Sequence, residues 1–215
     1  MKRLEWRTLA SASKIEYVDQ KSVFIAQAKP IASVEEANEF VAAVRAEYPD
    51  ARHHVYAWRL GGETVYQKYS DDGEPAGTAG MPVLDVLRKN DIDDAAVVVT
   101  RYFGGILLGT GGLVRAYGRS ALMAVEAAVP TVFHICELYE VMVSYSYLDK
   151  LLFSLEKAAY TVKKTTYDMD PTIFVLCDAG ESEPLIRLCT DITNGQAIIE
   201  YAGEDICGRA KECLP

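Results

Sequence analysis

The sequence predicts an α+β fold in two domains, and three features support this expectation. Strand-like and helix-like segments alternate along all 215 residues, and we find no internal repeat or low-complexity tract. The pattern breaks near residues 130–135, where Pro130 ends a helix-like segment. The segments that follow have the order β-α-β-β-α-β, the split βαβ of ferredoxin-like folds. We therefore expect one α+β domain at 1–132 and a ferredoxin-like domain at 133–215.

The first domain opens with two β-prone runs, which predict strands at 13–17 and 22–29. Ser33 and Glu36 form a capping box ahead of apolar residues at helical spacing, which predicts a helix over 34–48. A Gly-Gly pair then predicts a tight hairpin between strands at 54–60 and 64–69. A short helix follows at 83–89, with Pro82 at its first position. The last two elements are a buried strand at 95–100 and a long helix at 113–128.

The second domain has its own strand and helix patterns, and a turn at 168–171 separates its middle strands. Ser182 is a plausible N-cap for its second helix. The expected elements are a strand, a helix, two strands, a helix and a strand, at 138–145, 148–159, 161–167, 172–177, 184–192 and 197–201.

Composition and charge restrict the class of protein. Half of the residues are hydrophobic and a quarter are charged, which excludes a disordered or fibrous chain. No apolar run is long enough to span a membrane, and the first residues lack the apolar region of a secretory signal. We therefore expect a cytoplasmic protein with no membrane partner.

The net charge of −9 is unevenly distributed. Residues 1–134 carry 15 Lys and Arg against 17 Asp and Glu, a net of −2, whereas residues 135–215 carry 7 against 14, a net of −7. The acidic second domain is a poor phosphate-binding surface and fits a protein partner better. Contact with nucleic acid would need a local basic cluster in the first domain.

The cysteines point to neither a zinc ribbon nor a disulfide framework. None of the five belongs to a CxxC pair, and all lie in the second half of the chain, at Cys136, Cys177, Cys189, Cys207 and Cys213. We expect most of them to be reduced core residues, with Cys207 and Cys213 as candidate exposed thiols near the C-terminus.

A glycine-rich segment carries the first candidate site. Its five glycines are Gly104, Gly105, Gly109, Gly111 and Gly112. They lead into a helix, whose first N–H groups favour anions. Thr110 would cap that helix or contact a ligand, Arg115 and Arg119 share a helical face, and Arg101 ends the buried strand. No Walker or GxGxxG motif is present. Either the glycines permit a tight turn and close packing, or they form an anion or nucleic-acid backbone site.

A turn-rich segment carries the second candidate site. Asp71, Asp72 and Glu74 surround Gly73, and Thr78 follows in the same loop. Three carboxylates at this spacing suit magnesium or acid–base chemistry, but they are also typical of turns that satisfy their own backbone.

Histidine and aromatic residues lie close to both segments in sequence. His53 and His54 would point to opposite faces of a strand, and a structural role is favoured for them. An aromatic residue next to Arg101, Tyr102 or Phe103, would stack on a base, and the other residue of the pair is expected in the core. No metal, cofactor or catalytic residue is assigned.

Both segments resemble the signature of the IMPACT/YigZ family. The matching stretches are DDGEPAGTAG at 71–80 and VTRYFGGILLGTGGLVR at 99–115, with earlier blocks at 21–26 and 53–59. The resemblance implies an N-terminal βαβ domain of the ribosomal-protein and elongation factor G domain IV type. It also implies a ferredoxin-like C-terminal domain similar to elongation factor G domain V. Eukaryotic members regulate translation by restraining an amino-acid-starvation kinase through its activator, with an additional N-terminal domain.

The leading expectation is a non-enzymatic, translation-associated regulatory protein that binds RNA or the ribosome through its N-terminal domain. One alternative is an enzyme or small-ligand binder with a phosphate site between residues 104–112 and 71–80. The other is a protein-interaction module. The sequence indicates neither the ligand nor the oligomeric state, nor whether the two segments meet in space.

Overall fold

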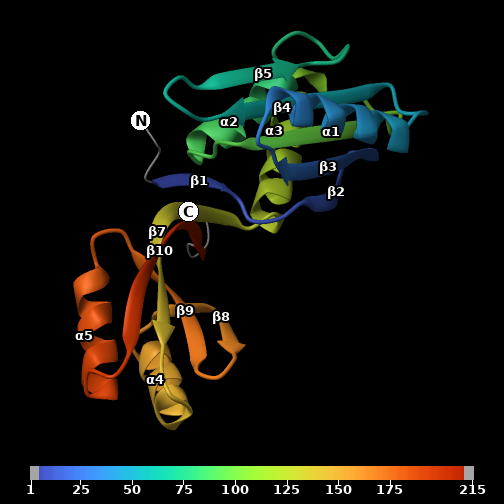
Figure 1. The fold of residues 1–215 in the computed structure, drawn as a ribbon. Coiled ribbons are helices and arrows are strands. Elements are labelled where there is room, and N and C mark those ends of the chain that lie inside the picture. Colours follow the sequence, from blue (N-terminus) through green and yellow to red (C-terminus); the bar gives the residue numbers. More distant parts are fainter. Residues whose placement is uncertain (1–4, 211–215) are drawn as a thin grey trace. The chain divides into compact units, whose positions relative to one another are not determined.

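The computed structural model describes residues 5–210, whose secondary structure is mixed α and β (Figure 1). The strands are β1 (Glu5–Leu9), β2 (Ser13–Asp19), β3 (Ser22–Pro30), β4 (His53–Leu60), β5 (Tyr66–Ser70), β6 (Ala95–Tyr102), β7 (Pro130–Met142), β8 (Thr161–Tyr167), β9 (Pro171–Asp178) and β10 (Ile198–Ala210). The helices are α1 (Val34–Glu47), α2 (Gly80–Lys89), α3 (Gly109–Ala127), α4 (Tyr145–Lys157) and α5 (Ser182–Thr193). The chain divides into two units: residues up to 133 with the end of β10 from Gly208, and residues 134–207.

The N-terminal unit is built on a five-stranded sheet of order β2-β3-β6-β4-β5, in which every neighbouring pair is antiparallel. The central strand β6 is buried from its first residue through Arg101. Its run of small and β-branched apolar side chains suits a strand that is covered on both faces.

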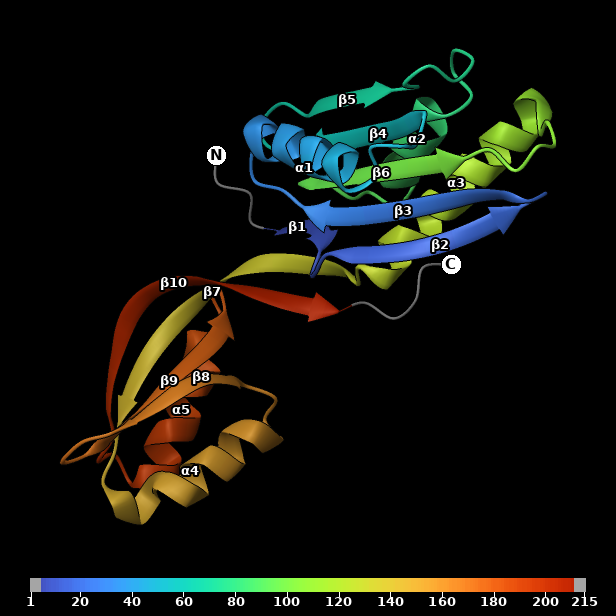
Figure 2. The same ribbon diagram turned by 90° about the vertical axis from the view of Figure 1, so that its right-hand side faces the viewer.

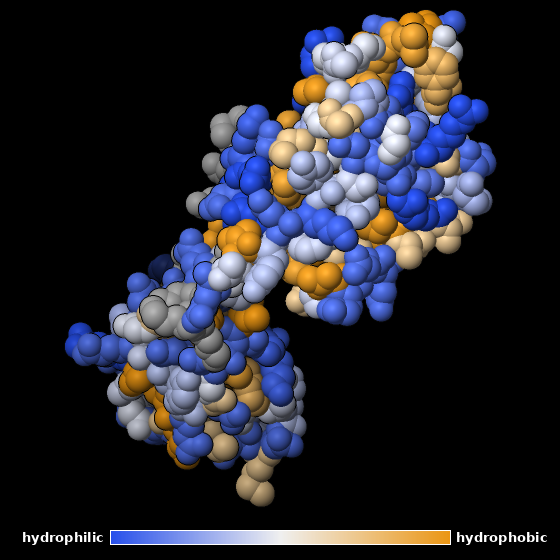
Figure 3. Space-filling model, turned by 90° about the horizontal axis from the view of Figure 1, so that it is seen from above, coloured by the Kyte–Doolittle hydropathy of each residue, from blue (hydrophilic) through white to orange (hydrophobic). Residues whose placement is uncertain are grey.

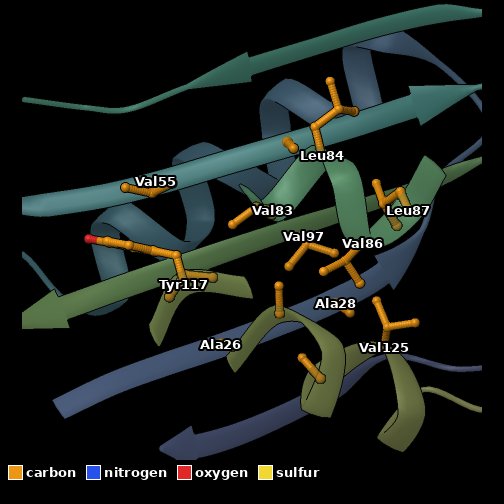
Figure 4. Close-up of a cluster of buried hydrophobic side chains, with 14 of the residues drawn as sticks. Ala26, Ala28, Val55, Val83, Leu84, Val86, Leu87, Val97, Tyr117 and Val125 are labelled. Atoms are coloured by element: carbon orange, nitrogen blue, oxygen red, sulfur yellow. The ribbon is translucent and has the colours of Figure 1, made fainter. Parts of the chain in front are cut away.

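Helices cover both faces of this sheet (Figures 1 and 2). On one face, α2 and α3 pack on β3, β4 and β6, where Val83, Leu87, Val97 and Tyr117 belong to one buried cluster (Figure 4). On the other face, α1 packs through Ala37 on a smaller cluster around the Trp58 ring. Alternate residues of each strand therefore serve different helices.

The C-terminal unit pairs β7 with both β9 and β10, and β9 with β8. Figure 2 shows helices α4 and α5 beside this sheet. They share one buried cluster with alternate residues of β7 and β9, among them Val141 and Val175. The element order β-α-β-β-α-β is the one that the sequence predicts.

Local signals predicted several elements well. Ser33 is the N-cap of α1, where its side chain accepts a hydrogen bond from the Glu36 N–H at 3.2 Å. The Glu36 carboxylate closes the turn on the N–H of Ala32 instead of that of Ser33. The caps predicted for two other helices are wrong. Pro82 is the third residue of α2 and not its first, and Ser182 is already helical in α5, with Glu181 at the N-cap.

Several element boundaries also differ from expectation, and the largest differences lie at the start of α3 and in strands that long-range pairing extends. Helix α3 begins at Gly109, four residues before the predicted start, so its first turn contains three of the motif's glycines. Strand β7 begins at Pro130, and β10 runs beyond 201. The unpredicted strand β1 pairs with β7.

The cysteine expectation was partly wrong. Cys136 and Cys207, 71 residues apart in sequence, form a disulfide with their Cα atoms 6.0 Å apart. Cys177 and Cys189 are free and buried, as expected. Cys213 lies outside the described residues. The pairing depends on β10 lying beside β7, which sequence spacing does not reveal.

Among the described residues, no helix has both the length and the apolar character that crossing a bilayer requires.

Candidate functional site

The first carboxylate of the 71–80 loop organises the backbone that follows it. Asp71 accepts hydrogen bonds from the N–H groups of Gly77, Ala79 and Gly80, at 2.9, 3.1 and 2.8 Å. These groups include the start of α2, whose N-cap residue Ala79 offers no side-chain acceptor. Asp71 therefore caps α2 from eight residues away and stabilises the positive end of the helix dipole.

The second carboxylate ties the loop to β4 and α1. Asp72 accepts a hydrogen bond from the backbone N–H of His54 at 2.6 Å and pairs with the Arg45 guanidinium. The Nδ1 atom of His53 lies 2.8 Å from the Asp72 carbonyl oxygen, and the Nε2 atom of His54 lies 3.0 Å from the Tyr48 carbonyl oxygen. Both histidine rings thus contact backbone carbonyl groups of neighbouring segments.

The third carboxylate joins the two motif segments. Glu74 Oε1 accepts one hydrogen bond from Arg101 Nη1 and one from the Tyr117 hydroxyl, each at 2.7 Å. All three side chains are buried. The 71–80 and 99–115 segments therefore meet inside the N-terminal unit, through the Glu74–Arg101 contact. Burial, together with the Glu74 charge, raises the pKa of Tyr117 above its ordinary value of 10.0, so its hydroxyl remains a donor.

Arg101 is placed inside the unit, with only 7% of its surface exposed. Its guanidinium lies between the rings of Phe24 and Phe103, 5.6 and 5.7 Å from their centroids. Its Nε atom is buried and has no hydrogen-bond acceptor among the described residues. Arg101 therefore forms an internal ion pair with Glu74, whereas Arg115 and Arg119 are exposed at the surface.

The β6–α3 loop is anchored at one glycine. A Cβ atom at Gly104 would lie 2.0 Å from the Lys21 carbonyl, so no other residue fits there without moving the β2–β3 turn. The Gly104 N–H also donates to the Ser22 hydroxyl at 3.2 Å. Gly105 and Gly109 adopt positive φ angles of 86° and 68°, which glycine tolerates best.

Beyond that anchor, the loop exposes apolar side chains. Phe103, Ile106 and Leu107 are 57%, 41% and 85% exposed. Separate hydrophobic patches lie elsewhere on the surface too, as Figure 3 shows for one face. Here, however, the apolar residues lie in one short loop that leads directly into α3.

The first turn of α3 has no side-chain cap. Leu108 is the N-cap residue, and Thr110, expected as a cap, lies inside the helix and is exposed. Arg115 Nη1 lies 3.7 Å from where a Cβ atom would stand at Gly111, so its guanidinium reaches back over this turn. We call Phe103, Ile106, Leu107, Thr110 and Arg115 the α3 surface.

A cavity of about 420 Å³ lies beside this surface. Its lining residues come from the start of β4, the end of β6 and the loop that follows: Asp50, Arg52, His53, Arg101, Tyr102, Phe103 and Leu107. Tyr102 is half-buried, and its hydroxyl donates to Asp50 at 2.8 Å, which raises the pKa of the phenol. The cavity therefore has two aromatic walls and basic side chains.

Sequence reasoning missed several residues that build the site. Tyr117 lies in the predicted helix at 113–128, and nothing in the local sequence pairs it with Glu74. Arg52 and Asp50 belong to no motif, although they form a charged pair next to the two histidines in the sequence.

The remaining residues predicted for the site have structural contacts. Gly112 packs on Leu108, whereas Gly73 follows Asp72 in a turn with positive φ. Thr78 donates to the Pro75 carbonyl inside its own loop.

The hydrogen bonds of the 71–80 loop limit what its carboxylates can do in metal binding or proton transfer. All three carboxylates of the 71–80 loop are held by backbone N–H groups, arginines or a buried tyrosine. They are therefore poorly placed as magnesium ligands or proton carriers. The exposed groups around the β6–α3 loop are glycine backbone, apolar side chains, arginines, the Thr110 hydroxyl and the Asp50 carboxylate.

Comparison with known proteins finds a matching family model and similar sequences and structures. The family model described as the Impact N-terminal domain matches residues 20–125. The chain is 33% identical over 193 residues to the IMPACT family member YvyE of Bacillus subtilis, covering 90% of this chain and 89% of that protein. It is 51% identical over 114 residues to the IMPACT family member YigZ of Escherichia coli, covering 51% and 56%. A crystal structure of a hypothetical protein matches with a TM-score of 0.59 at 33% identity, covering 92% and 97%.

Proposed function

Because this chain belongs to the IMPACT family, we propose that it is a non-enzymatic regulatory protein of translation. We propose further that it binds RNA or the ribosome through its N-terminal unit. The resemblance to the family supports the translational role. The α3 surface supports the binding role.

The observation that carries the proposal is the composition of the α3 surface. Uncapped N–H groups at the start of a 19-residue helix favour phosphate, and the Arg115 guanidinium lies over the same turn. Arg119 follows one turn later on the same side and is also exposed. Together these groups suit two consecutive phosphates of a nucleic-acid backbone.

The neighbouring cavity suits the bases of such a ligand. Single-stranded RNA presents unstacked bases, which proteins bind on aromatic and arginine side chains. Phe103 is exposed, Tyr102 is half-buried beside it, and Arg52 lies on the same cavity wall.

The C-terminal unit has a different part in this proposal. Its strand pairing places β10, β7, β9 and β8 in order, with both helices on one face, which supports a ferredoxin-like arrangement similar to elongation factor G domain V. The net charge of −7 over residues 135–215 repels phosphate. This unit therefore suits a basic protein partner.

The test is co-sedimentation with purified ribosomal subunits over a range of salt concentrations. The variant is Arg115→Ala/Arg119→Ala, and the control is Lys157→Ala/Arg187→Ala, which removes two exposed charges from the acidic unit. Arg101 is unsuitable for this purpose, because its loss would leave Glu74 buried without its ion-pair partner.

Wild type and control should co-sediment at low salt and dissociate as salt rises. The α3 variant should bind more weakly, with a slope of log affinity against log salt lower by about 1.4, or about 0.7 per single-strand phosphate contact. Salt-independent binding, or equal losses in both variants, would refute phosphate contact through this surface. A wild type that never co-sediments would refute stable ribosome association, and a thermal-shift screen of nucleotides and phosphate esters would then test the small-ligand alternative.

A further inference from the structure

Three adjacent strands of the C-terminal unit bring four metal-ligand side chains together. His134 and Cys136 are two residues apart on β7, so they share a face of the sheet. Asp178 on β9 is the register partner of Cys136, and Cys207 lies on β10, which pairs with β7 on its other side. This is the face opposite α4 and α5, because those helices pack on the alternate residues such as Tyr139 and Cys177.

The ligand atoms of three residues, His134, Cys136 and Cys207, are already close to the spacing of a tetrahedral site, and the Asp178 carboxylate lies beside two of them. His134 Nε2 lies 2.9 Å from Asp178 Oδ1 and 3.3 Å from Cys136 Sγ, and Cys136 Sγ lies 3.9 Å from Asp178 Oδ1. The atoms of His134, Cys136 and Cys207 all lie within 4.8 Å of one another. Zinc bond lengths of about 2.0–2.3 Å give tetrahedral edges of about 3.3–3.8 Å.

We propose that this cluster, once its disulfide is reduced, binds one Zn²⁺ ion through His134, Cys136, Cys207 and Asp178. Two thiolates, an imidazole and a carboxylate are ligands that zinc accepts, whereas magnesium and calcium prefer all-oxygen sites. Asp178 Oδ1 must move out of its 2.9 Å contact with His134 Nε2 to reach the fourth corner of the site. The two sulfur atoms must separate, from a covalent bond to an edge of about 3.8 Å. The Cα separation of 6.0 Å leaves room for that change by side-chain rotation.

The oxidised and zinc-bound forms exclude each other. A disulfide offers no thiolate, and zinc binds thiolate sulfur. A phosphine reductant breaks the S–S bond and takes an oxygen atom from water, which leaves two thiols. Zinc then displaces both thiol protons into solvent as it binds.

An ion can reach the cluster, and the other described thiols do not compete for it. The side chains of His134 and Asp178 are 14% and 32% exposed, and Cys207 is half-buried. Cys177 and Cys189 are buried on the other side of the sheet, in the cluster shared with α4 and α5.

The experiment uses the full chain carrying Cys213→Ser, reduced with a phosphine that is removed anaerobically. Co²⁺ reports the ligands through its absorption, and Zn²⁺ affinity is measured by competition with a chromophoric chelator. The expected result is one ion per chain, with the intense tetrahedral Co²⁺ bands and a thiolate charge-transfer band. Cys136→Ser and Cys207→Ser should each weaken Zn²⁺ binding at least about 100-fold.

The remaining ligands have a matched control. His134→Ala and Asp178→Asn should each weaken Zn²⁺ binding at least about 10-fold, whereas Asp191→Asn, which alters an exposed carboxylate on α5, should not change it. Circular dichroism of each variant without metal separates loss of a ligand from loss of the fold. The proposal is overturned if the reduced chain binds Zn²⁺ no more tightly than folded Cys136→Ser/Cys207→Ser, or if the oxidised chain binds it equally well.

Discussion

The two motif segments of the N-terminal unit are both rich in glycine, but their other side chains are arranged in opposite ways. The 71–80 loop turns its carboxylates inward, where each is held by hydrogen bonds to backbone, arginine or tyrosine. The 103–108 loop is anchored at Gly104 and otherwise turns apolar side chains outward, with Leu107 85% exposed. Polar side chains in a loop can therefore have all their hydrogen-bonding partners inside the protein, so that they are not available to a ligand. The apolar residues that remain exposed then mark the surface available to a partner.

The largest effect should come from the residue that links the two segments. Glu74→Ala leaves the Arg101 guanidinium buried without its ion-pair partner, and we expect a loss of about 3–5 kcal/mol in the free energy of unfolding. Urea denaturation measures this loss. The double variant Glu74→Leu/Arg101→Met removes both charges and should lose clearly less. Equal losses would mean that the buried charge is not the cause.

A second effect should depend on pH. Tyr117→Phe removes a hydrogen bond to a carboxylate and should cost about 1.5–3 kcal/mol at pH 7. The folded-state pKa of Tyr117 is raised above 10.0, so its contribution is complete below pH 10 and is lost as pH rises further. The stability difference between wild type and Tyr117→Phe should therefore shrink above pH 10. A difference that stays constant from pH 7 to 11 would contradict the assignment.

A smaller loss should follow from removing the remote cap of α2. Asp71→Ala deprives three backbone N–H groups of their acceptor, and we expect a cost of about 1–2 kcal/mol. Asp85→Ala, an exposed carboxylate on α2, is the matched control and should change stability by less than about 0.5 kcal/mol. If the two variants unfold at the same urea concentration, Asp71 does not cap the helix.

The smallest stability effect should fall in the outward loop. Leu107→Ser alters a side chain that is mostly in solvent, so the free energy of unfolding should change by less than about 0.5 kcal/mol. Binding to ribosomal subunits should nevertheless weaken, because the residue belongs to the α3 surface. A loss of stability as large as that of Asp71→Ala would show that both loops are structural, and the contrast between them would fail.

The sequence by itself determined the features that depend on neighbours along the chain. The order of strands and helices, the Ser33 cap and the buried character of β6 follow from periodicity and from hydrogen bonds over three or four residues. The two family segments were also visible as short runs of unusual residues. For these features, each signal lies within the element that it specifies.

Only the tertiary structure decided which groups meet. Glu74 lies 27 residues from Arg101 and 43 from Tyr117, and Cys136 lies 71 residues from Cys207. These contacts depend on the order in which strands pair and on the register between them, which residue spacing does not encode. The same reason explains why Arg101, a candidate binding residue in the sequence, is buried, whereas Leu107 faces solvent.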